Sequence, residues 1–169
     1  IEGLTRPSDI LNRLNEDFHV IFKDVDNVVL RDGMDVAFCS IDKTNMILEF
    51  AGAFNPLYLI RDNKITEIKG DRFAIGLDET NFKDQTFKNH LIPIQQGDII
   101  YIFSDGFADQ FGGPDGKKYK YRRFRHLLLN LHQLPMEKQH EILENNVLEW
   151  RGEQEQVDDI LVIGIKIDF

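Results

Sequence analysis

Two acidic motifs carry the residues best suited to chemistry, and each adjoins an apolar segment. In the first motif, Asp105 lies between Ser104 and Gly106, directly after residues 98–103 (DIIYIF). A carboxylate at the end of a buried strand, before a glycine that permits a tight turn, is held on a rigid element. Position alone favours equally a functional carboxylate and a turn residue that caps a short helix at 107–111.

The second motif is the pair Asp158-Asp159, which precedes the apolar segment 160–167 (ILVIGIKI). Adjacent strand residues point to opposite sides, so at most one of the two carboxylates faces a given site. Two neighbouring buried strands that each present a carboxylate at one end could share a divalent cation, and oxygen ligands favour Mg²⁺ or Mn²⁺. Position alone still favours the simpler interpretation, in which both are solvated acids that open a strand.

A basic segment follows the first motif: residues 117–125 (KKYKYRRFR) hold six Lys or Arg in a chain whose net charge is −9. The acidic total disfavours a general affinity for nucleic acid or anionic lipid. The segment itself could meet phosphate groups or an acidic partner. Its simpler interpretation, which is the more usual one for a charge run, is a solvated loop and first helical turn.

Other residue types give no comparable motif. The five His are scattered without a spacing typical of metal ligands, and Cys39 is the single Cys, expected to be a small buried group within a strand. Ser104 has no evident base partner, which argues against a serine nucleophile. The chain also contains no glycine-rich nucleotide-binding motif and no zinc-protease motif.

The composition indicates one globular domain: the chain has 169 residues, of which 42% are hydrophobic and 29% charged. No apolar run approaches the length of a membrane span, no signal-peptide pattern opens the chain, and one Cys cannot form an internal disulfide. We therefore expect a cytoplasmic domain without membrane contact.

The apolar pattern predicts a helix, a run of antiparallel strands, two helices and a last strand. Residues 27–33 are expected to be a loop or a frayed strand, and residues 70–81 a loop. The first two strands should form a hairpin, Asp62-Asn63 a two-residue hairpin turn, and Gly112-Gly113 should end the short helix. The expected elements are a helix at 7–24, strands at 34–41, 46–53, 57–61, 64–68, 86–93 and 98–103, helices at 124–131 and 135–150, and a strand at 160–167. The strands at 98–103 and 160–167 are apolar at nearly every position, so both faces of each should be covered. This order is typical of an α+β fold in which helices cover packed sheets.

These motifs together resemble the stage II sporulation protein E-like branch of the metal-dependent protein phosphatases, the PPM superfamily that includes protein phosphatase 2C. The Phe-Ser-Asp-Gly and Val-Asp-Asp-Ile elements, found in this order, are specific. The matching segments are 33–42 (GMDVAFCSID), 51–61 (AGAFNPLYLIR), 69–77 (KGDRFAIGL), 97–113 (GDIIYIFSDGFADQFGG) and 155–167 (EQVDDILVIGIKI).

The resemblance implies an αββα sandwich of two mainly antiparallel sheets flanked by helices. Residues 1–169 would form a single domain, the C-terminal portion of a PPM-type phosphatase domain without its N-terminal strands. The implied activity is hydrolysis of phosphoserine or phosphothreonine on a regulatory protein of the anti-sigma-factor antagonist type. Two Mn²⁺ or Mg²⁺ ions would activate the attacking water.

The resemblance also assigns roles to individual residues. Asp105 and Asp158 would bind one of the metal ions, and Asp109 matches an acidic position that some relatives use for a weaker third ion. Gly106 and Asn55 lie in the matched motifs and are further candidates for the catalytic site. Asp159 would support the turn and not the metal.

One family motif, an Asp followed by a Gly-His-Gly-like turn, does not occur and is expected to precede Ile1. We therefore expect the intact parent to be an enzyme and the 169-residue chain to be inactive. The alternative is a catalytically inactive PPM-like fold that serves as a protein-interaction or regulatory module. The expected partner is a phosphorylated protein and not nucleic acid, and an uncovered sheet edge could let the chain form a homodimer.

Overall fold

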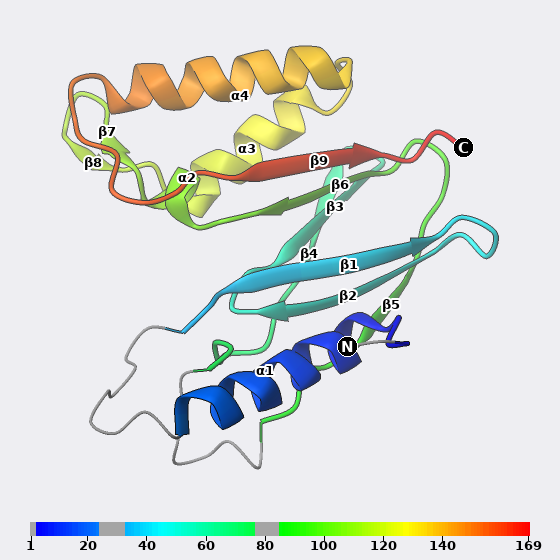
Figure 1. Cartoon of the computed structure of the whole chain (residues 1–169). Helices are drawn as coiled ribbons and strands as arrows, with labels where there is room; N and C mark the ends of the chain where they lie inside the picture. The colour runs from blue at the N-terminus through cyan, green and yellow to red at the C-terminus, as the bar shows by residue number, and fades with distance from the viewer. Residues whose placement is uncertain (1–2, 24–32, 77–84) are drawn as a thin grey trace. The chain divides into compact units, whose positions relative to one another are not determined.

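The computed structural model describes residues 3–23, 33–76 and 85–169, and the chain divides into two compact units (Figure 1). Unit 1 comprises residues 1–57, 68–96 and 169, and unit 2 comprises residues 58–67 and 97–168. Residues 27–32 and 77–81 of the expected loops, and the expected helix end at residue 24, lie outside the described residues.

Unit 1 contains a helix on a three-stranded sheet. The predicted first helix is confirmed as α1 (Pro7–Lys23), and the predicted hairpin is confirmed as β1 (Val36–Asp42) paired antiparallel with β2 (Ile47–Ala53). The sheet order is β1-β2-β5. The core consists of residues from α1, β2 and two connecting segments: Leu11, Ala51, Ala53, Ile75 and Phe87.

The strand predicted at 86–93 is shorter in the structure, where β5 spans His90–Pro93. The backbone N–H of Phe87 donates to Asn12 Oδ1 at 2.8 Å, and that of Lys88 donates to Asp71 Oδ2 at 2.8 Å. These amides bond to side chains of other segments. The alternation in the sequence therefore continues beyond the residues that pair in the sheet.

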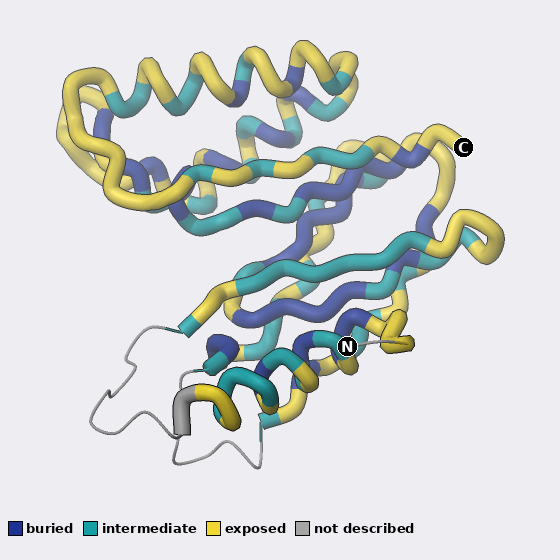
Figure 2. Tube along the Cα trace, in the orientation of Figure 1, coloured by how far each residue is buried: buried dark blue, intermediate teal, exposed yellow. Residues whose placement is uncertain are grey.

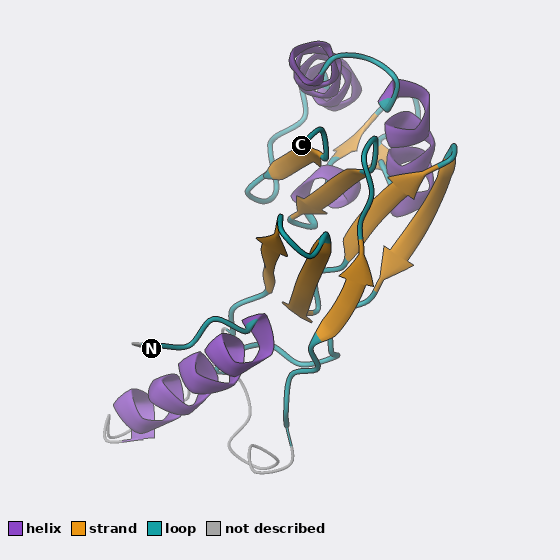
Figure 3. Ribbon diagram, turned by 90° about the vertical axis from the view of Figure 1, so that its right-hand side faces the viewer, coloured by secondary structure: helices purple, strands orange, loops and turns teal. Residues whose placement is uncertain are grey.

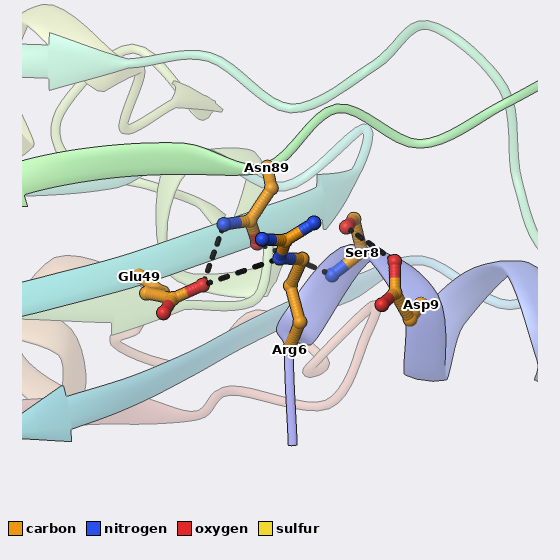
Figure 4. A network of polar contacts seen from close by, with 5 residues as sticks. All are labelled: Arg6, Ser8, Asp9, Glu49 and Asn89. Carbon is orange, nitrogen blue, oxygen red and sulfur yellow. Dashed lines mark hydrogen bonds and ion pairs between the residues drawn. The ribbon is translucent and has the colours of Figure 1, made fainter. Parts of the chain in front are cut away.

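A polar network ties the start of α1 to the sheet of unit 1 (Figure 4). The Asn89 amide donates to Glu49 Oε2 on β2 at 2.6 Å, and Arg6 Nε lies 3.9 Å from the same oxygen. The backbone N–H of Ser8 donates to Asn89 Oδ1 at 3.4 Å, and the Ser8 hydroxyl donates to Asp9 Oδ1 at 3.2 Å. Residues distant in the sequence thus fix where the helix begins.

Unit 2 contains a four-stranded sheet in the order β4-β3-β6-β9. Its strands are β3 (Leu57–Arg61), β4 (Lys64–Ile68), β6 (Ile99–Phe103) and β9 (Val162–Lys166). The turn between β3 and β4 has positive φ at Asp62 (49°) and Asn63 (58°), as a two-residue hairpin requires. Helices α3 (Tyr121–Leu131) and α4 (Met136–Arg151) pack on this sheet (Figure 3).

Two features of unit 2 differ from the sequence expectation. Strand β6 is buried as predicted, but β9 lies at the sheet edge and is half exposed, with Ile163 40% exposed (Figure 2). The helix after Asp105 is α2 (Gly106–Asp109), and residues Phe111–Gly112 form strand β7, which pairs with β8 (Lys117–Lys118). The glycines expected to end a helix therefore belong to a small hairpin.

Aromatic rings connect the elements of unit 2. The Phe103 ring of β6 lies 5.0 Å from Phe124 of α3, and Phe124 lies 4.6 Å from Phe107 of α2. Tyr119 is 5.2 Å from Phe107 on one side and 5.2 Å from Trp150 of α4 on the other. This row packs α2 and the segment after β8 against both long helices. Its contacts have the edge-to-face geometry that aromatic rings prefer, except that of Phe107 with Phe124, whose rings are tilted by 34°.

A second contact holds α4 on the sheet. The buried Tyr101 hydroxyl of β6 donates to Gln139 Oε1, and the Gln139 amide donates to the Leu134 carbonyl at 2.8 Å. Burial raises the pKa of Tyr101 to about 12. The described residues thus form an α+β fold with antiparallel strand pairs and four helices, as predicted. None of these helices is long and apolar enough to cross a membrane.

An ion pair joins two strands of unit 2. Arg61 at the end of β3 donates to both carboxylate oxygens of Asp98, from Nε at 2.8 Å and from Nη2 at 2.6 Å. The Asp98 side chain is 1% exposed and the Arg61 side chain is 34% exposed. The hydrogen bond with Asp98 raises the pKa of Arg61 further.

Because Asp98 is the buried partner, the two truncations should differ. Arg61→Ala leaves a buried carboxylate without its bidentate partner and should lower the free energy of unfolding by about 3 kcal/mol or more. Asp98→Ala leaves a guanidinium that can reach water and should cost about 1–2 kcal/mol. Urea unfolding followed by circular dichroism measures both, with exposed Asp168→Ala as the control. A larger loss for Asp98→Ala would contradict this assignment.

Candidate functional site

Asp105 lies in the turn that leads from β6 into α2. It occupies the N-cap position of α2 with helical dihedral angles (φ −72°, ψ −18°), and its side chain makes no capping hydrogen bond. Its backbone carbonyl accepts from the Asp109 N–H at 2.9 Å. Of the two interpretations that its position allowed, the capping role is therefore not observed, and the carboxylate is left available for another contact.

Ser104 connects this turn to the segment before β9. Its hydroxyl donates to the Asp159 carbonyl at 2.7 Å and accepts from the Leu161 N–H at 2.9 Å. Its own N–H donates to the Leu161 carbonyl at 3.0 Å. Sequence reasoning considered Ser104 only as a nucleophile; in the structure it positions the two acidic motifs next to each other.

Gly106 is required by the same close approach. A Cβ atom at this residue would lie 2.4 Å from the Asp159 carbonyl oxygen, so any larger side chain would collide with backbone. Gly106 was predicted as a catalytic residue, and its observed contact is one of packing. The turn can approach the Asp158-Asp159 segment this closely only with glycine at this position.

The electrostatics of the turn also bring the acidic residues together. Partial burial raises the pKa of Asp105, and the negative charges of Asp158 and then Asp109 raise it further, whereas Lys118 lowers it. Asp158 is exposed, and its Oδ1 accepts from the Asp159 N–H at 2.7 Å. Three carboxylates thus concentrate negative charge at one end of unit 2, where a cation would relieve their mutual repulsion.

Asp109 already has a cationic neighbour. Its Oδ2 accepts from Lys118 Nζ of β8 at 2.7 Å, in a pair whose side chains are 37% and 43% exposed. The sequence predicted Asp109 as an acidic group for a weaker third ion and gave no indication of Lys118 as its partner. The β7–β8 hairpin supplies that partner, and recognising this hairpin in the sequence would have indicated it.

Asn55 belongs to unit 1, in the turn between β2 and β3. Its N–H donates to the Ala53 carbonyl at 2.6 Å, after Phe54, whose φ is 55°. A Cβ atom on Gly52 or Gly70 would lie 2.4 Å or 2.8 Å from the Asn55 carbonyl oxygen. The observed contacts of Asn55 therefore shape a tight turn, and its catalytic role stays a prediction.

The donor set near Asp105 suits a hard divalent cation in kind, because it consists of carboxylate oxygens. In number it is small: no group of three or more His, Cys, Asp and Glu in the described residues is arranged to hold a metal ion. The assignment of Asp105 and Asp158 to one ion therefore stays a prediction.

Comparisons with known proteins bear on this site. The family model of the stage II sporulation protein E (SpoIIE) matches residues 2–168. No curated protein matches the chain. The solved SiaA-PP2C domain of Pseudomonas aeruginosa is 30% identical with a TM-score of 0.86, and the match covers 99% of this chain but only 63% of that one.

Two further solved structures share the fold at lower identity. The phosphatase domain of the cell-fate determinant SpoIIE from Bacillus subtilis is 12% identical with a TM-score of 0.61, and the match covers 100% of this chain and 77% of that one. The RsbU and RsbW domains of Rv1364c from Mycobacterium tuberculosis give 16% identity and a TM-score of 0.68, with 98% and 43% of the two chains covered. The fold is PP2C-like, as predicted, and the chain belongs to the stage II sporulation protein E (SpoIIE) family of the PPM superfamily.

Proposed function

We propose that the protein is a metal-dependent serine/threonine phosphatase domain whose substrate is a phosphorylated regulatory protein of the anti-sigma-factor antagonist type. The observation that carries this proposal is the close approach of the Asp105 turn to the Asp158-Asp159 segment, which the hydrogen bonds of Ser104 with the Asp159 carbonyl and the Leu161 N–H hold together. Family membership supports it, as does the likeness to the SiaA-PP2C domain. The domain would be the C-terminal part of a PPM-type phosphatase.

In this proposal Asp105 and Asp158 hold one Mn²⁺ or Mg²⁺ ion of a two-metal site. Such ions lower the pKa of bound water and neutralise charge on phosphoryl oxygens. The residues of the chain supply the position: Ser104 keeps the two carboxylates on adjacent segments, and Gly106 permits the approach. Asp159 contributes its backbone carbonyl, which accepts the hydrogen bond from the Ser104 hydroxyl.

Removing the charge of Asp105 should separate metal binding from stability. Asp105→Asn should abolish Mn²⁺ binding measured by calorimetry and lower turnover of the intact parent by about a hundredfold or more, because metal-ion stabilisation amounts to several kcal/mol. In EDTA the same variant should unfold at an equal or higher temperature, since it removes a repelled charge. Asp115→Asn, an exposed acid of the β7–β8 turn, is the charge-matched control. Unchanged Mn²⁺ binding in Asp105→Asn would refute the metal role.

The hydrogen bonds of Ser104 and the close approach at Gly106 should matter for both fold and activity. Ser104→Ala removes two hydrogen bonds and should lower the free energy of unfolding by about 1–3 kcal/mol. Gly106→Ala should cost at least as much, because the added methyl group meets a backbone carbonyl. Gly116→Ala is the comparison, since its φ is 59° but nothing lies within 4 Å of its Cβ position. If Gly116→Ala lowers the unfolding temperature more than Gly106→Ala does, the close approach is unimportant.

The small number of metal ligands in this chain leads to a prediction about its activity. Two carboxylates should bind Mn²⁺ weakly, so the 169-residue chain should show little turnover, whereas the intact parent should be active with Mn²⁺ or Mg²⁺ and inactive in EDTA. Hydrolysis of a phosphoserine protein by both proteins, with and without metal, tests this. Metal-independent turnover by either protein would contradict the proposal, and a parent inactive with both metals would favour a binding module.

A further inference from the structure

A basic groove of about 1200 Å³ lies in unit 2, between β8, α3 and the C-terminal half of α4. Its cationic lining comprises Lys117, Lys118, Lys120, Arg122, Arg123 and Arg125. One carboxylate, that of Glu149, faces these six cations. The basic segment noticed in the sequence is therefore folded into a concave surface and is not a simple solvated loop.

Half of these cations are already neutralised and half are not. Lys118 pairs with Asp109 at 2.7 Å, Arg125 with Glu67 at 3.1 Å, and Lys117 with Asp115 at 3.5 Å. The other three, which are Lys120, Arg122 and Arg123, form no ion pair within the described part of the chain. The groove thus carries a net positive charge in a chain whose total charge is −9.

The three unpaired cations break a local rule of helix electrostatics. Lys120 is the N-cap of α3, and Arg122 and Arg123 lie in its first turn, where the helix dipole disfavours positive charge. Lys120 also has a φ of 75°, a conformation that side chains rarely adopt. Local conflicts of this kind are expected at functional surfaces, where a ligand supplies the missing compensation.

One of these cations is held in place. The Arg123 guanidinium lies 4.3 Å from the centre of the Trp150 ring, within the range of a cation–π contact. This contact restrains the position of the guanidinium, whose N–H groups suit recognition of carboxylate or phosphate. Beside it, partly buried Leu127, Leu129 and Ile65 give the groove an apolar component.

One residue, Lys118, links the groove to the acidic site. Lys118 lines the groove and also pairs with Asp109, and its charge lowers the pKa of Asp105. We propose that the groove docks an acidic segment of the phosphoprotein partner and so brings its phosphoserine toward Asp105. This inference rests on the proposed function and names the recognition surface for the same site.

The charge and lining favour a protein segment over nucleic acid as the occupant. Carboxylates spaced along a peptide can meet Lys120, Arg122 and Arg123, while apolar side chains of the same peptide contact Leu127 and Leu129. A nucleic acid would extend its phosphates beyond the groove, over a surface whose remaining charge is negative. Electrostatic complementarity of this local kind sets partner choice and association rate.

The test measures binding in EDTA, so that it does not depend on turnover. The probe is a short fluorescent peptide of Glu, Asp and Leu with one phosphoserine, compared with the same peptide carrying Gln for every acid and with a single-stranded oligonucleotide. The groove variant is Lys120→Gln/Arg122→Gln/Arg123→Gln, which keeps side-chain length. The charge-matched control is Lys88→Gln/Lys138→Gln/Lys166→Gln, whose residues are exposed and lie outside the groove.

We expect the acidic peptide to bind about tenfold more weakly to the groove variant and within about twofold of wild type to the control variant, because three exposed charge contacts are removed. Binding to wild type should also weaken between about 0.05 M and about 0.5 M NaCl. Equal affinity for the acidic and Gln peptides, or equal loss in both variants, would overturn the proposal, as would tighter binding of the oligonucleotide. If the phosphatase activity is refuted while these binding results hold, the groove stands and the assigned reaction falls.

Discussion

The pairing of β6 with β9 is the constraint on which unit 2 depends. Phe103 pairs with Val162 and Ile99 with Lys166, so the end of one strand meets the beginning of the other. Asp105 follows Phe103 and Asp158 precedes Val162, and the antiparallel register therefore brings both motifs to one end of the sheet. A slip of one residue would turn every side chain of β9 to the opposite face. The three hydrogen bonds of Ser104 fix the register at that end.

Positive charge from the basic groove partly neutralises the negative charge of the acidic turn. Asp105 and Asp158 repel each other, and Asp109 adds to the repulsion. The β7–β8 hairpin brings Lys118 against this cluster, and α4 anchors the hairpin: the Gly113 N–H donates to the Trp150 carbonyl at 2.7 Å, and the Trp150 indole donates to the Gln110 carbonyl at 3.0 Å. A cation of the protein thus meets part of the negative charge of the site.

Local sequence patterns were sufficient where one element decides its own structure. The period of α1, the turn at Asp62-Asn63 and the burial of β6 were all predicted, because each depends on residues close in sequence. The exposure of β9 was not predicted, because a strand at the edge of a sheet can have the same apolar sequence pattern as a central strand. The length of β5 was also missed, since the amides of Phe87 and Lys88, before the strand, bond to side chains from distant segments.

The candidate site shows the same division. Asp105, Asp158 and Gly106 could be selected from their motifs, and the structure brings the two segments that carry them into contact. The hydrogen bond between Ser104 and Leu161 joins residues 57 positions apart, and the pair of Lys118 with Asp109 joins residues 9 positions apart. No periodicity in the sequence reveals such contacts. The groove was visible only as a run of charge, because its concave shape needs α4, whose residues lie further along the chain.

The interleaving of the two units has a consequence for the order of events during synthesis. The chain enters unit 2 for β3 and β4, returns to unit 1 for β5, and enters unit 2 again at residue 97. Unit 1 can complete its sheet once residue 93 has left the ribosome, but the β3–β4 hairpin must wait for β6, and β6 for β9. The carboxylate pair forms only when the last strand emerges. A nascent chain stalled before residue 158 would therefore contain every residue that lines the basic groove but only one carboxylate of the pair.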